Sequence, residues 1–279
     1  MSAQVRPTAL VTGASSGIGA AFAQALAARG YDLVLNARRA SRLEKTATAL
    51  QLQHQIKTLV VAEDLSDPMA PRRITDTVHA HGLQIDMLVN NAGYGLPGRF
   101  DEQAWMAHND FLQVMIHAPT ELAHRVLPGM LERGHGRIIN IASLAGHLPG
   151  STGHTLYAAS KAYMIRFSQS LALENRSRGV NVCALCPGFT YSEFHDVTGT
   201  RDLVSRMPSW MWMDADTVAR QGLDAVERGD VVYINGRVNR AIKALSEMLP
   251  DRLALRLSDR HSRRYRSLEK PPGADPHEH

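Results

Sequence analysis

The chain has 279 residues, 44% hydrophobic and 21% charged, a composition that supports a packed core and argues against general disorder. The net charge is +4, and residues 237–279, with ten Lys or Arg against six Asp or Glu, account for all of it. Because the charges of the remaining chain balance, no basic stripe supports nucleic-acid binding.

Strand-like and helix-like segments alternate along the chain. The predicted strands are residues 8–12, 31–37, 56–62, 85–90, 136–142, 180–186 and 231–234, and the predicted helices are residues 18–29, 41–54, 68–81, 101–133, 154–178 and 216–228. This alternation indicates right-handed crossovers and a parallel sheet. The sequence therefore predicts one α/β domain, a Rossmann-like, doubly wound parallel sheet of about seven strands with helices on both faces.

We expect this domain to span residues 1–236, including a long irregular segment at 190–214, the lid. Residues 237–268 predict two amphipathic helices, broken at Pro250, that pack on the domain or extend it, and residues 269–279 predict a disordered tail. Their apolar stripe consists of Ile242, Leu245, Leu249, Leu253 and Leu257. Such a stripe most often packs on its own protein; a subunit interface is the second interpretation, and peripheral contact with an anionic membrane surface is the third.

The two cysteines, Cys183 and Cys186, lie in one predicted strand. Residues three apart on a strand point to opposite faces, so we expect core packing rather than a redox or metal pair. The first strand leaves no room for a secretory signal, and no run of about 18 apolar residues indicates a membrane span. We therefore expect a cytoplasmic protein without a metal.

A glycine-rich turn, Gly13-Ala14-Ser15-Ser16-Gly17-Ile18-Gly19, separates the first predicted strand from the first helix. Glycines permit a tight turn and let the backbone approach a pyrophosphate. The helix N-terminus offers that pyrophosphate unpaired N–H groups and a positive dipole end. A structural turn would look similar in isolation, but the position directly after the first strand favours a dinucleotide site.

Further motifs follow this turn in chain order: Asp64-Leu65, Asn90-Asn91-Ala92-Gly93, Tyr157-Ala158-Ala159-Ser160-Lys161 and Pro187-Gly188. With Thr12 and the Gly-x3-Gly-x-Gly turn, they resemble the short-chain dehydrogenase/reductase family. The resemblance implies an oxidoreductase that binds a nicotinamide dinucleotide. The cofactor-binding residues that it implies are Gly13, Ser15, Ser16, Gly17, Ile18, Gly19, Asp64, Leu65, Asn91, Ala92, Gly93, Tyr157, Lys161, Pro187, Gly188 and Thr190.

The end of the second predicted strand decides between NAD and NADP. An Asp or Glu there would bond the ribose hydroxyls and repel a 2′-phosphate, but the chain has Asn36-Ala37-Arg38-Arg39. Arg38 is well placed to pair with the phosphate, although two solvated arginines at a helix start would give the same sequence. We expect NADP as the cofactor, with Arg38 among its ligands.

Tyr157 and Lys161 lie four residues apart in a predicted helix and therefore share one face. A free tyrosine has a pKa near ~10 and is a poor base at neutral pH. We expect the neighbouring ammonium to lower the pKa of Tyr157, so that the phenol can exchange a proton with the substrate oxygen. Lys161 can also bond the nicotinamide ribose.

Ser143 ends a predicted strand at the carboxyl edge of the sheet, where open α/β folds bind ligands. The resemblance makes it the hydroxyl that orients the substrate carbonyl, and it completes a catalytic set with Tyr157 and Lys161. Ser143 precedes Tyr157 by fourteen positions, one more than the common family spacing, and the loop at 150–154 can absorb the difference.

One position departs from the family. The helix before the Ser143 strand usually carries an Asn that holds a water relaying protons to the lysine. Aligned on Ala118-Pro119, this position is Met115, whose thioether is at best a weak acceptor and cannot donate. We expect hydride transfer to persist with an altered proton path, such as a water held by backbone carbonyls.

The lid carries Met207, Trp210, Met211, Trp212 and Met213. Such side chains suit a hydrophobic carbonyl or alcohol substrate, and burial against the C-terminal helices or another subunit is the equal alternative. The resemblance also implies a homodimer or homotetramer. We therefore expect an NADP(H)-dependent oxidoreductase that interconverts a carbonyl and a secondary alcohol. The alternative, which Met115 alone favours, is an NADP(H)-binding sensor or interaction module with little turnover.

Overall fold

The structure, a computed structural model, describes residues 6–96, 98–153, 155–191 and 208–266. Seven parallel strands form one sheet in the order β3-β2-β1-β4-β5-β6-β9. They are β1 (Thr8–Thr12), β2 (Asp32–Asn36), β3 (Thr58–Val61), β4 (Ile85–Asn90), β5 (Gly136–Ile141), β6 (Val180–Cys186) and β9 (Val232–Ile234). The prediction of a doubly wound sheet is confirmed, and the strand order reverses between β1 and β4.

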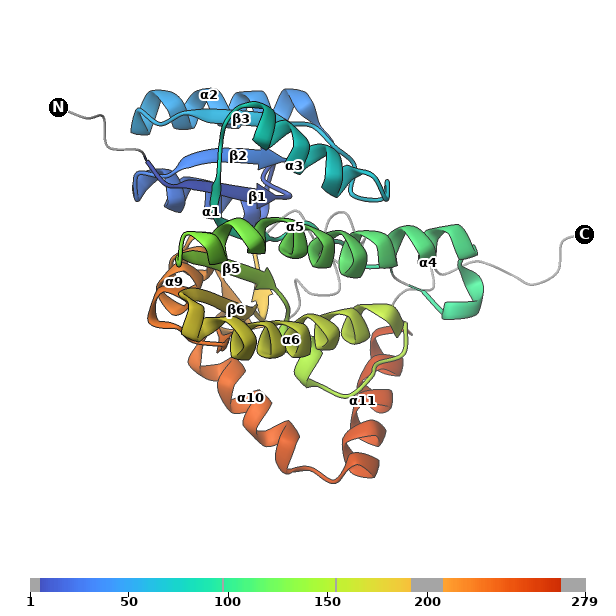
Figure 1. Cartoon of the computed structure of the whole chain (residues 1–279). Helices are drawn as coiled ribbons and strands as arrows, with labels where there is room; N and C mark the ends of the chain where they lie inside the picture. The colour runs from blue at the N-terminus through green and yellow to red at the C-terminus, as the bar shows by residue number, and fades with distance from the viewer. Residues whose placement is uncertain (1–5, 97, 154, 192–207, 267–279) are drawn as a thin grey trace, which may run out of the picture.

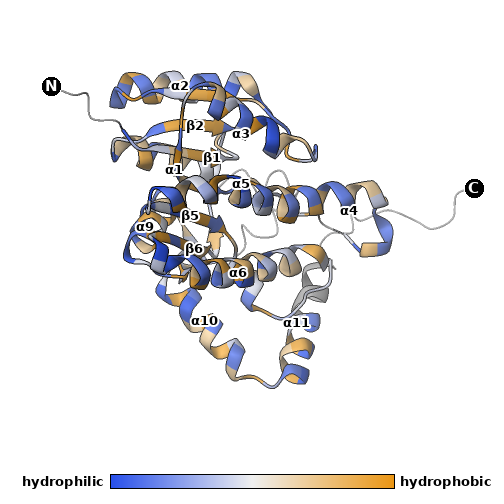
Figure 2. Ribbon diagram, in the orientation of Figure 1, coloured by the Kyte–Doolittle hydropathy of each residue, from blue (hydrophilic) through white to orange (hydrophobic). Residues whose placement is uncertain are grey.

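Helices cover both faces of this sheet (Figure 1). One core packs α1 (Gly17–Ala28), α2 (Ala40–His54) and α9 (Ala215–Arg228) on the sheet, and the other packs α3 (Ala70–Ala80), α5 (Ala118–Glu132) and α6 (Thr155–Asn175). Successive strand residues supply the two cores in turn: Ala9 and Val11 face the first, and Leu10 faces the second. Figure 2 shows these hydrophobic strands between helices with polar outer faces.

The two cysteines of β6 pack as expected in separate parts of the core. Cys183 belongs to the core under α1 and α9, whereas Cys186 packs with Met164 and Ile165 of α6. Burial raises the pKa of each thiol to about 12, so neither is a reactive thiolate at neutral pH.

The predicted helical region over residues 101–133 is confirmed from Trp105 to Glu132, but it is not one regular α-helix. The segment comprises a 3-10 turn (Phe100–Glu102), α4 (Trp105–Leu112), a π-helical turn (Gln113–His117) and α5. Pro119 provides a physical reason, because it lacks the N–H that would bond the carbonyl of Met115 in an α-helix. The chain widens there instead, and Ala118 N–H bonds the carbonyl of Gln113, five residues back.

The C-terminal residues form a helical hairpin, α10 (Arg237–Met248) and α11 (Asp251–Arg266), below α6 in Figure 1. The hydroxyl of Ser258 on α11 donates to the carbonyl of Gly150, at 2.8 Å. The predicted apolar stripe is only partly covered: Ile242 and Leu249 are half-buried, whereas Leu245, Leu253 and Leu257 are exposed. No helix within the described ranges has the length and apolar character needed to cross a membrane.

Residues 192–207 of the predicted lid, including Met207, and the predicted tail at 269–279 lie outside the described residues. The described parts of the lid form β7 (Phe189–Thr190), a 3-10 turn (Ser209–Met211) and β8 (Trp212–Met213). β7 and β8 pair in parallel, with Thr190 opposite Met213. This pairing holds the two ends of the lid together.

A buried chain of polar side chains connects β4, β5 and α6. The Asn90 amide donates to Asn140 Oδ1 at 2.9 Å, and the Asn140 amide donates to Ser168 Oγ at 2.9 Å. Ser168 Oγ donates in turn to the carbonyl of Met164, at 2.7 Å. All three side chains are removed from water, and Asn140 makes its two bonds to Asn90 and Ser168, whereas Asn90 also donates to the carbonyl of Pro119 at 3.0 Å.

Replacing Asn140 by Ala should therefore lower the free energy of unfolding by about 2–3 kcal/mol, because it strands Asn90 and Ser168 without their partner. Urea unfolding followed by circular dichroism measures this. Gln53→Ala on the exposed face of α2 is the control and should change stability by less than about 0.5 kcal/mol. Equal stabilities of the two variants would contradict a structural role for the chain.

Candidate active site

The glycine turn is locked against the loop that follows β4. Gly13 has a φ of +66°, and a Cβ on Gly19 would lie 2.2 Å from the carbonyl oxygen of Gly13. The Asn91 amide donates to the carbonyl of Thr12 at 2.9 Å, and Thr12 Oγ1 accepts the N–H groups of Asn91 and Ala92, each at 3.0 Å. Only glycine fits this close approach, and the first turn of α1 stays open to a phosphate.

The predicted site residues all lie at the carboxyl edge of the sheet. The glycine turn follows β1, Arg38 follows β2, Asp64 and Leu65 follow β3, Asn91 to Gly93 follow β4, and Ser143 follows β5. Pro187, Gly188 and Thr190 follow β6. The carbonyl of Pro187 accepts the Leu144 N–H at 2.9 Å, which joins this last loop to the one that begins at Ser143.

The adenosine end of the expected cofactor site carries Arg38 and Asp64. Arg38 Nη1 lies 4.0 Å from Asp64 Oδ2, and the arginine side chain is 72% exposed. Neighbouring Arg39 donates to Ser15 Oγ in the glycine turn, at 3.5 Å. Asn36 ends β2 where an acid would repel a 2′-phosphate, and its amide instead donates to the carbonyls of Val61 and Glu63.

At the other end of the edge, the structure brings Ser143, Tyr157 and Lys161 together. Ser143 Oγ accepts the Ala145 N–H at 3.1 Å, and the Ser143 side chain is close enough to the Tyr157 phenol to lower its pKa. Lys161 is buried, and its Nζ lies 5.7 Å from the centre of the Tyr157 ring. The ammonium donates to the carbonyl of Ile141, the last residue of β5, at 2.7 Å. Three polar groups thus meet at one point of the sheet edge.

The expected lowering of the Tyr157 pKa is wrong, because the pKa of this phenol is raised. Desolvation of the phenol by the surrounding protein raises the pKa of Tyr157 to about 12, and the hydrogen bond to Ser143 opposes this only in part. Burial also lowers the pKa of Lys161 to about 8. At neutral pH the phenol therefore holds its proton and is poised to donate it.

Gly146 is a site residue that the sequence interpretation missed. A Cβ at this position would lie 2.7 Å from the backbone carbon of Lys161, so only glycine lets the 3-10 turn Leu144–His147 pack directly on α6. That contact sets the distance between Ser143 and the helix that carries Tyr157. The available signal was a glycine three residues after the serine, in a segment with no other reason for one.

Comparisons with known proteins agree with this geometry. The sequence pattern described as short chain dehydrogenase matches residues 7–201. The chain belongs to the short-chain dehydrogenase family. It is therefore an oxidoreductase of the kind that acts on CH–OH groups with a nicotinamide cofactor.

Individual relatives and solved structures show which members of the family this chain is similar to. The chain is 38% identical over 184 residues to a 3-oxoacyl-(acyl-carrier-protein) reductase of Escherichia coli (strain K12), covering 65% of this chain and 72% of the relative. A short-chain dehydrogenase from Sphingobium yanoikuyae in complex with NADPH is 31% identical, with a TM-score of 0.76 over 88% of this chain and 96% of that one. The bulky-bulky ketone specific alcohol dehydrogenase from Comamonas testosteroni is 30% identical, with a TM-score of 0.72 over 88% and 95%.

In this short-chain dehydrogenase the departure at Met115 lies inside the π-helical turn. Met115 is buried, and its sulfur lies against Gly93, where a Cβ would sit 2.9 Å away. A thioether in this place fills space and offers no proton donor. The widened turn and the missing N–H of Pro119 alter the hydrogen bonding of the helix carbonyls at the same point.

The low pKa of Lys161 predicts a pH-dependent stability. Its pKa is about 8 in the folded protein against an ordinary 10.5, so the unfolded chain binds more protons between these values and stability rises with pH across that window. Replacing Lys161 by Met should thus stabilise the cofactor-free protein by about 1–2 kcal/mol at pH ~7, after the lost bond to Ile141 is counted.

Urea unfolding of both proteins at neutral pH and near pH ~10 measures this difference. The advantage of the Met variant should shrink as the pH rises through the window, because the buried lysine of the folded wild type loses its proton and no longer carries a desolvated charge. A difference that does not change with pH would show that Lys161 carries no desolvation cost. Comparing the two proteins at each pH cancels the titration of Tyr157, which both contain.

Proposed function

We propose that the protein is an NADP(H)-dependent oxidoreductase that reduces the carbonyl group of a hydrophobic substrate or oxidises the corresponding secondary alcohol. The observation that carries this proposal is the buried Lys161, which donates to the carbonyl of Ile141 at 2.7 Å and lies 5.7 Å from the centre of the Tyr157 ring, beside Ser143. These groups lie at the same sheet edge as the glycine turn. A donor pair and a cation placed there suit a reaction in which charge develops on a carbonyl oxygen.

NADP is the cofactor that fits the residues present. The close approach of Gly13 and Gly19 leaves backbone where a side chain would block a pyrophosphate. Arg38 offers a guanidinium to a 2′-phosphate, and β2 ends in Asn36 rather than an acid. The Sphingobium yanoikuyae relative, which is a complex with NADPH, supports the same choice. When bound, NADPH supplies the hydride.

The side chains of this protein handle the proton. Ser143 donates to the substrate oxygen and orients the carbonyl. Tyr157, with a pKa of about 12, is protonated at neutral pH and gives its proton to the same oxygen as the alcohol forms. The phenolate left behind is stabilised by the nearby Lys161 ammonium.

Aromatic side chains next to this site support a hydrophobic substrate. Tyr191 stacks on Trp212 with ring centres 4.7 Å apart, and Phe189 lies 5.6 Å from the same indole. Trp210 is 64% exposed. An acyl chain or a bulky ketone fits such surroundings, in keeping with the substrates named for the Escherichia coli and Comamonas testosteroni relatives. Membership of the short-chain dehydrogenase family likewise favours a homodimer or homotetramer.

Tyr157→Phe should abolish turnover while leaving NADPH binding intact, because it removes only the hydroxyl that transfers the proton. NADPH oxidation with a panel of hydrophobic ketones and aldehydes should fall by about 100-fold or more. Tyr163→Phe, on the same helix, is the control and should keep wild-type activity. Equal turnover of wild type and Tyr157→Phe would overturn the catalytic assignment.

An NADP(H)-binding protein with little turnover remains the second candidate, since Met115 removes the usual proton relay. Met115→Asn tests the relay, because an amide can both donate and accept at this position. We expect the variant to raise kcat or to shift its pH profile. Met115→Leu, which restores no hydrogen bond, should do neither. An Asn variant with unchanged kcat at every pH would mean that protons do not pass through this position.

A further inference from the structure

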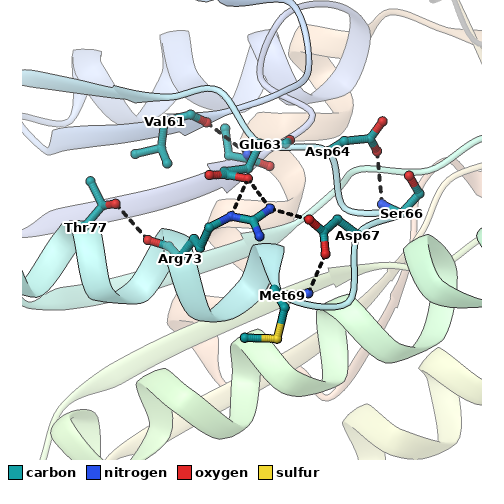
Figure 3. Close-up of polar contacts among 9 residues, drawn as sticks. Val61, Glu63, Asp64, Ser66, Asp67, Met69, Arg73 and Thr77 are labelled. Atoms are coloured by element: carbon teal, nitrogen blue, oxygen red, sulfur yellow. Dashed lines mark hydrogen bonds and ion pairs between the residues drawn. The ribbon is translucent and has the colours of Figure 1, made fainter.

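Three carboxylates lie on the short loop after β3, at the adenosine end of the cofactor site. They are Glu63, Asp64 and Asp67, and Figure 3 shows them together on this loop. Asp64 lies 4.0 Å from Arg38, the guanidinium proposed to bind the 2′-phosphate. A phosphate ester carries close to two negative charges, so carboxylates here oppose NADP far more than NAD, which has a neutral hydroxyl in that position.

One arginine outside the cofactor site forms hydrogen bonds to two of these carboxylates. Arg73, on α3, donates from Nε and Nη2 to Glu63 Oε2, at 2.9 and 2.6 Å. Its Nη2 also donates to Asp67 Oδ2 at 2.7 Å. Figure 3 shows the guanidinium between Glu63 and Asp67 while Asp64 points away from it. Arg73 thus places a positive charge between the residues that flank Asp64.

The ionised states of this cluster reinforce one another. Hydrogen bonds from the Met69 N–H and from Arg73 lower the pKa of Asp67, and the two carboxylates raise the pKa of Arg73. Asp67 and Arg73 are both charged at every pH at which the protein would be assayed. The charge that they place near the cofactor site therefore does not change with pH.

The loop has other anchors that do not involve Arg73. The Asn36 amide donates to the carbonyls of Val61 and Glu63, at 3.0 and 3.2 Å, and Asp64 Oδ1 accepts the Ser66 N–H at 3.0 Å. Loss of Arg73 would leave these contacts in place. Its main consequence would be two carboxylates without their cation, next to the position of the 2′-phosphate.

We propose that Arg73 is a specificity-determining residue that favours NADP over NAD without touching the cofactor, because its positive charge offsets one of the two negative charges of Glu63 and Asp67. Asp64 lies nearest to Arg38 and is the carboxylate of this loop that competes with the phosphate for it. This inference rests on the proposed function, since it requires the NADP site at Arg38.

The test is to titrate NADPH and NADH into the full-length protein and follow the nicotinamide fluorescence at low and at high salt. Arg73→Gln should weaken NADPH binding by about fivefold and NADH binding by less than about twofold, and high salt should reduce this loss of selectivity. Arg73→Lys, which keeps the charge and loses the forked contact, should lose less. Arg72→Gln is the matched control, because Arg72 pairs at 3.4 Å with Asp76 on its own helix.

A rescue separates electrostatics from loop position. Adding Glu63→Gln to Arg73→Gln removes one uncompensated carboxylate and should recover most of the lost NADPH affinity. Equal weakening of NADPH and NADH by Arg73→Gln, or an unchanged ratio, would overturn the inference while the wild type still binds NADPH. A wild-type protein that binds neither nucleotide would instead overturn the proposed function, and the inference with it.

Discussion

The hydrogen bond from Lys161 Nζ to the carbonyl of Ile141 is the contact on which the active site depends. It joins α6 to the end of β5 across 2.7 Å, in a place that water does not reach. Because the ammonium is desolvated, the pKa of Lys161 falls to about 8. The fold therefore keeps a positive charge in apolar surroundings that disfavour it. That cation remains close to Tyr157, beside the phenol that we propose transfers the proton.

The same edge of the sheet is held elsewhere by short polar side chains that bond backbone. Thr12 and Asn91 tie the glycine turn to the loop after β4, and Asn36 ties β2 to the loop after β3. These bonds use backbone groups that would otherwise be left without partners at the strand ends. They also fix the loops rigidly enough for a dinucleotide to find its contacts already in place.

Much of the fold and site followed from local patterns. β1, β4 and β6 have the predicted bounds, because buried parallel strands are nearly continuous apolar runs that end at polar residues. Tyr157 and Lys161 share a helix face because four residues make about one turn. The π-helical turn at Met115 was missed, since helical periodicity does not reveal where an absent N–H, such as that of Pro119, widens the helix.

By itself, the sequence determined the order of strands and helices along the chain, the glycine turn and the spacing of Tyr157 and Lys161. Each of these features depends on residues that lie close together along the chain. Only the tertiary structure decided the charge states and the long-range contacts. Burial, which no local pattern encodes, raised the pKa of Tyr157 against the expected effect of Lys161. Packing between separate elements likewise produces the contact of Gly146 with α6 and the hydrogen bonds from Arg73 to Glu63 and Asp67.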